Sequence, residues 1–243
     1  MYYSTSFVEE RSVSQRVRPL VSVVIAAVNE AEGIGHTLEE LRNFLSNPRL
    51  VVVDGRSIDR TVEIAKDMGA EVLVQESEGK GDAIYQGIKQ LGSQACYVVF
   101  TDADFTYPAE YVPKMLGILD QDPSVGMVIG DRFSFVRNPD KYPMNPFYIG
   151  NRLIALAQHI VNGIKLNDPL SGLRVVRAEI LRGRKIKSKG FDFEAEINHV
   201  VEREGYRIVE IPIAYRSRLG EKKLRLRHGF GILKRIIVES FTA

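Results

Sequence analysis

"VVFTDADFTYPAE", residues 98–110, is an apolar run that ends in two aspartates one residue apart. Its apolar part is typical of a strand in the core of a parallel sheet. Two carboxylates this close repel each other, and burial adds a desolvation cost, so neither aspartate favours folding. Asp102 and Asp104 therefore indicate a site that needs negative charge at the end of a strand.

Apolar runs alternate with helical patterns throughout the first half of the chain. In residues 34–45, Ile34, Leu38 and Leu41 recur at the spacing of one helix face, and helices are also predicted over 59–68 and 81–91. The apolar runs around these helices are "LVSVVIAAV" (20–28), "RLVVVDG" (49–55), "AEVLVQE" (70–76) and "ACYVVF" (95–100). Continuous apolar strands between helices are typical of a parallel sheet covered on both faces. The sequence therefore predicts an α/β fold with a Rossmann-like, doubly wound sheet.

The pattern changes after about residue 130. Strands are predicted over 124–133 and 206–215, helices over 146–164 and 191–204, and a loop, "LNDPLSGLR", over 166–174. On the first of these helices, one face carries the apolar residues Ile149, Leu153, Leu156, Ile160 and Ile164. No linker rich in Pro, Gly or Ser interrupts the chain, so we expect a single domain.

The composition is that of a soluble globular protein, with 44% hydrophobic and 26% charged residues among 243. The single cysteine, Cys96, excludes an internal disulfide, which favours a reducing compartment, and we expect its side chain to be buried. The longest apolar runs are far shorter than the roughly 20 residues of a membrane-spanning helix, and the N-terminus lacks a secretory signal.

Positive charge gathers in the C-terminal third, although the net charge is only +2. Residues 174–189 hold seven Lys and Arg against one Glu, and residues 216–235 hold eight against one. Such asymmetry indicates an anionic partner, with a solvated basic surface as the equal alternative.

Polar residues follow the predicted strands at the edge where ligands bind in open α/β sheets. Asn29 and Glu30 follow the first strand, Asp54 ends the second, and Asp102 and Asp104 end the fourth. The aspartate pair becomes favourable if Mg²⁺ or Mn²⁺ lies between it and a diphosphate. The alternative is that these carboxylates only shape turns and helix starts. No dinucleotide fingerprint or P-loop is present.

The motifs together resemble the inverting family 2 glycosyltransferases of the GT-A fold. The matching stretches are "VVIAAVNEAEGI", "VVVDGRSIDRTVEIA", "EGKGDAIYQGI", "TDADFTYPAEYV", "GDRF", "NDPLSGLRVVRAEIL", "GFDFEAEI" and "VEIPIAYRSRLGEKKL". Within the later stretches, "DPLSG" and "EIPIAYRSRLGEKKL" are similar to the dolichyl-phosphate mannose and glucose synthase group, in its short form without transmembrane helices. The sequence departs from the pattern in three places: no proline precedes Asn29, Gly55 replaces a second aspartate, and Lys222 stands where serine is common.

The resemblance implies a mixed, mainly parallel sheet and transfer of a hexose from a GDP- or UDP-linked sugar to a polyprenyl (dolichyl) phosphate. It implies that Glu30 and Asp54 contact the nucleoside, that Asp102 contacts ribose or metal, and that Asp104 is the main ligand of Mg²⁺ or Mn²⁺. Asn29, Lys80 and Asp82 complete the expected nucleotide-sugar site; for Lys80 a solvated turn is the alternative.

A phosphate acceptor is already anionic and needs cations rather than a base. We expect Arg132, Arg152, Arg218 and Lys223 to bind it, with Ser171 nearby. If the acceptor were a hydroxyl, Asp168 would be the candidate base, and Asp192 the second. The remaining alternatives are a small soluble acceptor such as a phosphorylated acid, and a non-catalytic module that binds nucleotide sugars.

The predicted organisation has a flexible segment over 1–18 and one glycosyltransferase domain over 19–226. A nucleotide-sugar half covers about 19–130 and an acceptor half about 131–226. Residues 227–243 form a basic amphipathic segment with Phe230, Leu233, Ile237 and Phe241 on one face. This segment either lies on an anionic membrane or packs on the core. We expect a cytoplasmic protein at the membrane face that does not bind nucleic acid, and the oligomeric state stays open.

Overall fold

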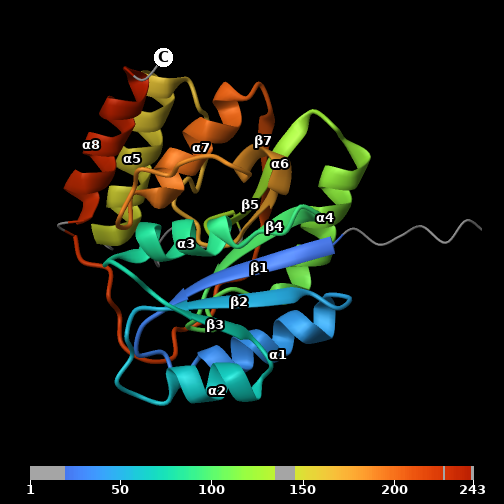
Figure 1. Cartoon of the computed structure of the whole chain (residues 1–243). Helices are drawn as coiled ribbons and strands as arrows, with labels where there is room; N and C mark the ends of the chain where they lie inside the picture. Colours follow the sequence, from blue (N-terminus) through green and yellow to red (C-terminus); the bar gives the residue numbers. More distant parts are fainter. Residues whose placement is uncertain (1–19, 135–145, 227, 242–243) are drawn as a thin grey trace, which may run out of the picture.

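The computed structural model describes residues 20–134, 146–226 and 228–241. The predicted flexible segment, 1–18, lies outside the described residues. Within them, seven strands form one sheet in the order β3-β2-β1-β4-β6-β5-β7 (Figure 1). No helix of the described part combines the length and the apolar character that a bilayer crossing requires.

The elements of the first half alternate as predicted. They are β1 (Leu20–Ala27), α1 (Ile34–Phe44), β2 (Arg49–Asp54), α2 (Thr61–Asp67), β3 (Glu71–Val74), α3 (Lys80–Lys89) and β4 (Ala95–Asp102). Strands β1 to β4 pair in parallel, and the register sets Asp54 opposite Ala27 and Asp102 opposite Ala26. The carboxyl ends of β1, β2 and β4 therefore meet at one edge, where the sequence has its polar residues.

The second half adds an antiparallel strand to the sheet. Its elements are η1 (Ala109–Tyr111), α4 (Val112–Gln121), β5 (Val125–Asp131), α5 (Pro146–Asn162), β6 (Arg174–Arg177), α6 (Ala178–Leu181), α7 (Phe193–Arg203), β7 (Arg207–Pro212) and α8 (His228–Ser240). Strand β6 pairs antiparallel with both β4 and β5, and β7 pairs parallel with β5. The sheet is thus mixed and mainly parallel, which confirms the predicted fold class. Strand β6 was not predicted, because four residues are too few for a periodic signal.

The sheet separates two apolar layers, since alternate strand residues point to opposite faces. On one face, Val23 and Ile25 of β1 pack in a cluster with Leu38 of α1 and Met115 of α4. On the other face, Val24 packs in a cluster with residues of α3, α6 and α7. Helices α5 and α8 lie outside α7, where Ile154, Ala195, Ile232 and Ile236 form a separate cluster (Figure 1).

Helix α5 exposes the apolar stripe that the sequence pattern predicted to face the core. Such a stripe normally faces the core, but Leu153, Leu156 and Ile160 are exposed, the last at 72%. The buried side includes Asn151 and Gln158. Gln158 Nε2 donates to the carbonyl of Ala195 at 3.1 Å, so a polar side chain with a partner occupies the inner face.

Cys96 is also placed differently from the prediction. Its side chain is exposed, whereas Ala95 and Tyr97 on either side are buried. Leu20 of β1 pairs with Ala95 and Val21 pairs with Tyr97, so the register shifts here and Cys96 is the extra residue of a bulge. Ala95 and Tyr97 therefore pack on opposite faces of the sheet, and Cys96 faces solvent.

The packing of α3 on β1 gives a test of the fold. A Cβ added at Gly87 in α3 would lie 2.3 Å from Val24 Cγ1, whereas at Gly117 in α4 it would meet nothing within 4 Å. Glycine to alanine in a helix normally stabilises by about 1 kcal/mol, and overpacking a core costs about 1–3 kcal/mol. We expect Gly87→Ala to lower the free energy of unfolding and Gly117→Ala to raise it slightly, as measured by chemical denaturation. Equal effects of the two substitutions would contradict this packing.

Candidate active site

A cavity of about 850 Å³ opens at the carboxyl ends of the parallel strands. Asp102 and Asp104 are among the residues that line it. One group of lining residues follows β1, β2 and β3, and another comes from the start of α5 and of α8. The cavity thus joins the polar edge of the sheet to the outer helices.

Asp104 is held in place by its own loop and by the C-terminal segment. Its Oδ1 accepts hydrogen bonds from the Thr106 backbone at 3.1 Å and hydroxyl at 2.6 Å. Its Oδ2 accepts from Arg218 Nη1 at 2.7 Å. Phe105, the next residue, has a left-handed φ of 64°, which is uncommon for a bulky side chain and typical of functional loops. Burial and the neighbouring Asp102 raise the pKa of Asp104.

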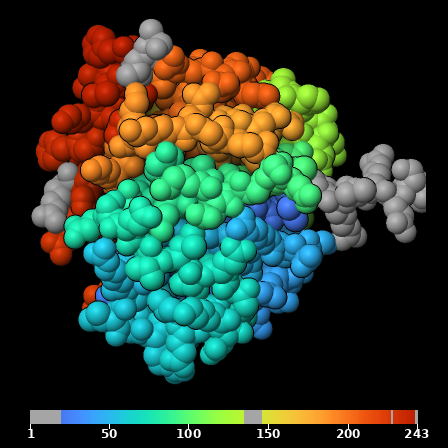
Figure 2. Space-filling model, in the orientation of Figure 1, coloured from blue at the N-terminus to red at the C-terminus, as the bar shows by residue number. Residues whose placement is uncertain are grey.

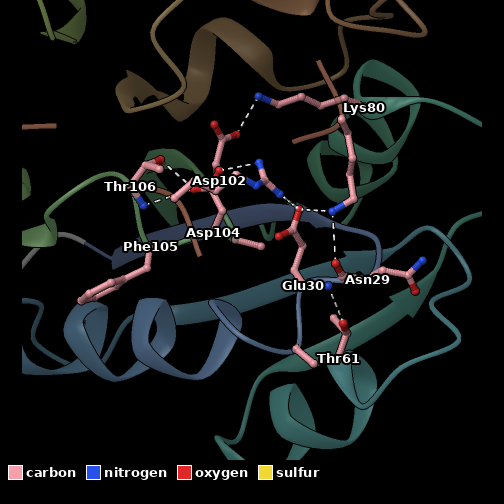
Figure 3. Close-up of polar contacts among 12 residues, drawn as sticks. Asn29, Glu30, Thr61, Lys80, Asp102, Asp104, Phe105 and Thr106 are labelled. Carbon is pink, nitrogen blue, oxygen red and sulfur yellow. Dashed lines mark hydrogen bonds and ion pairs between the residues drawn. The ribbon is translucent and has the colours of Figure 1, made fainter. Parts of the chain in front are cut away.

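Asp102 shares a lysine with a residue that the sequence analysis missed. Lys80 Nζ lies 2.7 Å from Asp102 Oδ1 (Figure 3). The same atom lies 2.7 Å from Glu194 Oε1. Burial would raise the pKa of Asp102, but Lys80 outweighs this effect and holds the pKa below its usual value. Glu194 lies in the first turn of α7, 114 residues away from Lys80. Its only sequence signal is its place in "GFDFEAEI".

Glu30 is the third buried carboxylate of the site. It forms ion pairs with Arg218 and with Lys223, whose Nζ lies 2.6 Å from Glu30 Oε1. Burial is the largest influence and raises the pKa of Glu30 despite these two cations. Among the described residues, Glu30 Oε2 and Arg218 Nε have no hydrogen-bond partner. These atoms leave hydrogen-bonding capacity for a ligand.

Arg132 is fixed by Asp168, the residue predicted as the base for a hydroxyl acceptor. Arg132 Nε and Nη2 donate to the two carboxylate oxygens at 2.6 and 2.7 Å. Asp168 is fully buried and also accepts from Asn151 Nδ2 at 3.0 Å. Arg132 lines the cavity but Asp168 does not. Both carboxylate oxygens of Asp168 thus accept from Arg132, and its use as a base for a hydroxyl acceptor stays a prediction.

Lys222 is a cavity cation that sequence reasoning did not select. Its Nζ lies 3.1 Å from the centre of the Phe147 ring, and no carboxylate of the described residues lies within ion-pair distance of it. Burial, together with the positive charges of Arg132 and Arg218, lowers the pKa of Lys222. The basic run after β7 signalled cations here, but not which of them would lack a partner.

Arg152 does not reach the site. Its side chain is exposed on α5 and does not line the cavity. The cause is the rotation of α5, which turns Asn151 inward and Arg152 outward. Arg152 is therefore removed from the predicted set of phosphate-binding residues.

Four other predicted residues, Asn29, Asp54, Asp82 and Ser171, are not among the residues that line the cavity. Asp54 accepts from the Ser57 backbone at 3.0 Å, and Asn29 Oδ1 accepts from the Ile58 backbone at 2.9 Å. Asp82 accepts from Gln75 Nε2 at 3.3 Å, and Ser171 is fully buried. Gly55, Arg56 and Gln75 line the cavity at this end instead. Direct contact of these four side chains with substrate stays a prediction.

The acidic pair fits a divalent cation only together with a substrate. No group of three or more His, Cys, Asp or Glu side chains in the described part of the chain converges as a metal site. Asp102 and Asp104 offer hard oxygen ligands, and Mg²⁺ is commonly bound by one or two carboxylates plus substrate phosphates. Arg218 now neutralises Asp104, so a cation bound there would compete with this arginine.

Comparison with known proteins places the chain among glycosyltransferases. The sequence model of glycosyl transferase family 2 matches residues 22–184. A dolichyl-phosphate hexose transferase from Haloferax volcanii is 36% identical, over 84% of this chain and 86% of its own length. An undecaprenyl-phosphate mannosyltransferase from Micrococcus luteus is 31% identical, over 84% and 87%. A dolichol-phosphate mannosyltransferase from Pyrococcus furiosus is 28% identical, and the match spans 88% of this chain but 64% of that protein.

The fold has solved counterparts. A glucosyl-3-phosphoglycerate synthase from Mycobacterium tuberculosis, crystallised with Mn²⁺, UDP-glucose and phosphoglyceric acid, superposes with a TM-score of 0.73. It covers 92% of this chain and 80% of its own, at 21% identity. The likeness establishes the GT-A fold.

Replacing Asp104 tests two effects of its charge separately: the effect on the stability of the folded protein and the effect on binding of metal and nucleotide. Because its pKa is raised, the ionised carboxylate destabilises the folded protein at neutral pH, and this cost disappears as the pH falls through that pKa. We expect Asp104→Asn to keep or raise the melting temperature at pH 7 without ligands. The advantage over the wild type should shrink toward pH 4. The variant should also lose the stabilisation that Mn²⁺ with GDP or UDP gives the wild type.

Differential scanning fluorimetry measures both effects, with the exposed Asp67→Asn as the matched control. An unchanged response of Asp104→Asn to Mn²⁺ and nucleotide would show that the metal binds elsewhere.

Proposed function

The chain belongs to glycosyl transferase family 2 and is a glycosyltransferase, and from this premise we propose that it transfers a hexose from a nucleotide-diphosphate sugar to a polyprenyl phosphate. The observation that carries the proposal is the composition of the cavity at the strand ends. Carboxylates, unpaired positive charge and apolar side chains line it together. The relatives named for dolichyl and undecaprenyl phosphate support the acceptor class.

The donor is proposed to bind at the edge formed by β1, β2 and β4. Asp104 and Asp102 would hold Mg²⁺ or Mn²⁺ against the diphosphate, and the bound cation would neutralise the charge of the leaving group. Glu30, whose Oε2 lacks a partner, is placed to accept a hydrogen bond from the nucleotide sugar. Lys80 holds Asp102 in position through its link to Glu194. The base and the sugar are left to experiment, with GDP-mannose, UDP-glucose and UDP-N-acetylglucosamine as candidates.

The acceptor phosphate is proposed to bind next to Arg132 and Lys222. A phosphate oxygen attacks the anomeric carbon from the side opposite the diphosphate, a new C–O bond forms, and the bond to the nucleoside diphosphate breaks. The phosphate is ionised at neutral pH, so no protein group has to remove a proton. This agrees with the role of Asp168, which orients the guanidinium of Arg132. A fixed arginine fork suits phosphate oxygens.

Arg218 connects the two substrate sites. It pairs with Asp104 and Glu30 in the absence of substrates. A metal ion that binds Asp104 would weaken this pair by competing for the carboxylate. The freed guanidinium, next to Lys222 and Lys223, could then bind the incoming phosphate. Donor binding would thus prepare the acceptor site.

A polyprenyl phosphate resides in a membrane, so the proposal includes peripheral association with the cytoplasmic membrane face. The amphipathic segment predicted over 227–243 contains α8, and Arg227 and residues 242–243 lie outside the described residues. Ile232 and Ile236 of α8 pack on the protein, whereas Phe230 and Ile237 are exposed. The helix therefore both packs on the core and offers apolar side chains to a membrane.

Product partitioning tests the reaction. Radiolabelled candidate donors are incubated with Mn²⁺ and either a polyprenyl phosphate in detergent or phosphoglycerate. We expect label in the organic phase only with the lipid, loss of transfer on adding EDTA, and a fall of at least about 100-fold for Asp104→Asn. Label that stays in water with phosphoglycerate would establish the soluble-acceptor alternative. Nucleotide-sugar binding without transfer to either acceptor would indicate a binding module.

Lys222 tests the acceptor site separately. Because a lost charge-assisted hydrogen bond to phosphate costs about 1.5–3 kcal/mol, we expect Lys222→Met to raise the KM for the lipid phosphate at least about tenfold and to leave the donor KM unchanged. Its pKa is lowered, so the wild type should lose acceptor affinity as the pH rises through that pKa. Lys222→Arg should move this loss to higher pH, and Lys222→Met should remove it. The exposed Lys114→Met is the control, and equal damage to both KM values would argue against an acceptor role.

A further inference from the structure

Helices α5 and α8 lie side by side and run in the same direction. Ile154 of α5 packs in one cluster with Ile232 of α8, and Asn162 Nδ2 near the end of α5 donates to the carbonyl of Ile236 at 3.3 Å. Both helices cover α7, through Ala195 in the same cluster. In the space-filling view, α8 lies at the outer edge of the molecule (Figure 2). The opposite sides of both helices are therefore free of the core.

These outer sides are apolar, and we call them the α5–α8 face. Its exposed side chains are Ile149, Leu153, Leu156, Ile160 and Val161 on α5, and Phe230, Ile237, Val238 and Phe241 on or directly after α8. Phe230 and Phe241 are 79% and 82% exposed. A monomeric soluble protein exposes apolar side chains singly, and a group of this kind marks an interaction surface.

The charges on the α5–α8 face are positive. Helix α5 contains no Asp or Glu, and its Arg152 is exposed among the apolar residues. On α8, Lys234 is exposed, whereas Glu239 is buried and pairs with Arg235. A second copy of the chain docked on the same face would bring cations against cations. An anionic lipid surface complements both the apolar and the positive side chains.

The α5–α8 face adjoins the cavity at the first turns of both helices. Phe147 and Ile154 of α5, and Gly229 and Ile232 of α8, line the cavity. Since the helices run in parallel from this point, the apolar stripes lead directly away from the cavity wall. A chain that left the cavity between these helix starts would continue along an apolar surface.

We infer that the α5–α8 face binds the surface of an anionic bilayer, with the cavity mouth turned toward the lipid. This orientation rests on the proposed function, because a lipid-borne acceptor must enter the cavity from the membrane. Arg152, which does not reach the active site, acquires a role as a cation at the lipid headgroups. The inward packing of α8 makes the surface part of the folded domain.

Vesicle co-sedimentation tests the face directly. The full chain is mixed with vesicles of phosphatidylcholine alone or with phosphatidylglycerol, and three variants are compared. In the apolar variant, Ile160→Gln, Ile237→Gln and Phe241→Gln are combined, and we expect at least about 100-fold weaker binding. In the charge variant, Arg152→Gln and Lys234→Gln are combined, and we expect about fivefold weaker binding per cation removed, only on phosphatidylglycerol. The control is Phe44→Gln at the end of α1, where the side chain is 44% exposed.

A transfer assay separates this inference from the proposed function. With a short, water-soluble prenyl phosphate, the apolar variant should be as active as the wild type; with a long-chain acceptor in vesicles it should lose activity. Unchanged vesicle binding by the apolar variant would overturn the inference. The inference would also be overturned if analytical ultracentrifugation showed a dimeric wild type and a monomeric apolar variant, while the wild type did not bind vesicles. If the wild type transfers no sugar to either prenyl phosphate but binds vesicles through this face, the proposed function fails and the membrane surface stands.

Discussion

The ion pairs that join Asp104 and Glu30 to Arg218 are the constraint on which the rest of the structure depends. Both carboxylates are buried, and burial raises the pKa of each. The positive charge of Arg218 lowers the pKa of each carboxylate and so offsets part of the cost of burying them. The segment after β7 must therefore cross the strand ends and bring its cations to the acids. The same crossing closes the cavity over the site.

The backbone of this segment is fixed as well as its side chains. The Leu219 N–H donates to the carbonyl of Asp104 at 3.1 Å, and the Arg216 N–H donates to the carbonyl of Thr106 at 3.0 Å. Arg216 also pairs with Glu40 of α1 at 2.6 Å. The same segment therefore neutralises the acids and fixes the positions of the basic residues. The cations of this segment therefore act as counter-charges to the buried acids Asp104 and Glu30.

In the second half of the molecule, polar contacts determine which side of α5 is buried. Asp168 accepts from Arg132 and Asn151, and Gln158 of α5 reaches the backbone of α7. These contacts rotate α5 so that its polar residues face inward and its apolar stripe faces solvent. One rotation therefore supports the cavity arginine and creates the α5–α8 face. The candidate active site and the inferred lipid-binding surface thus share the same helix.

By itself, the sequence determined the parallel half of the sheet, the position of the acidic pair and the family. Each of these rests on local signals: apolar runs such as residues 20–28, helix spacing, and "TDADF" after a strand. Only the tertiary structure decided that Lys80 pairs with Glu194 and that Asp168 holds Arg132. It also decided that no carboxylate of the described residues pairs with Lys222 and that Arg152 is exposed. These facts depend on contacts between residues far apart in the chain, such as the 114 residues that separate Lys80 from Glu194. A local pattern reports how a segment folds, but the partner of a buried charge is set by whichever distant segment packs against it.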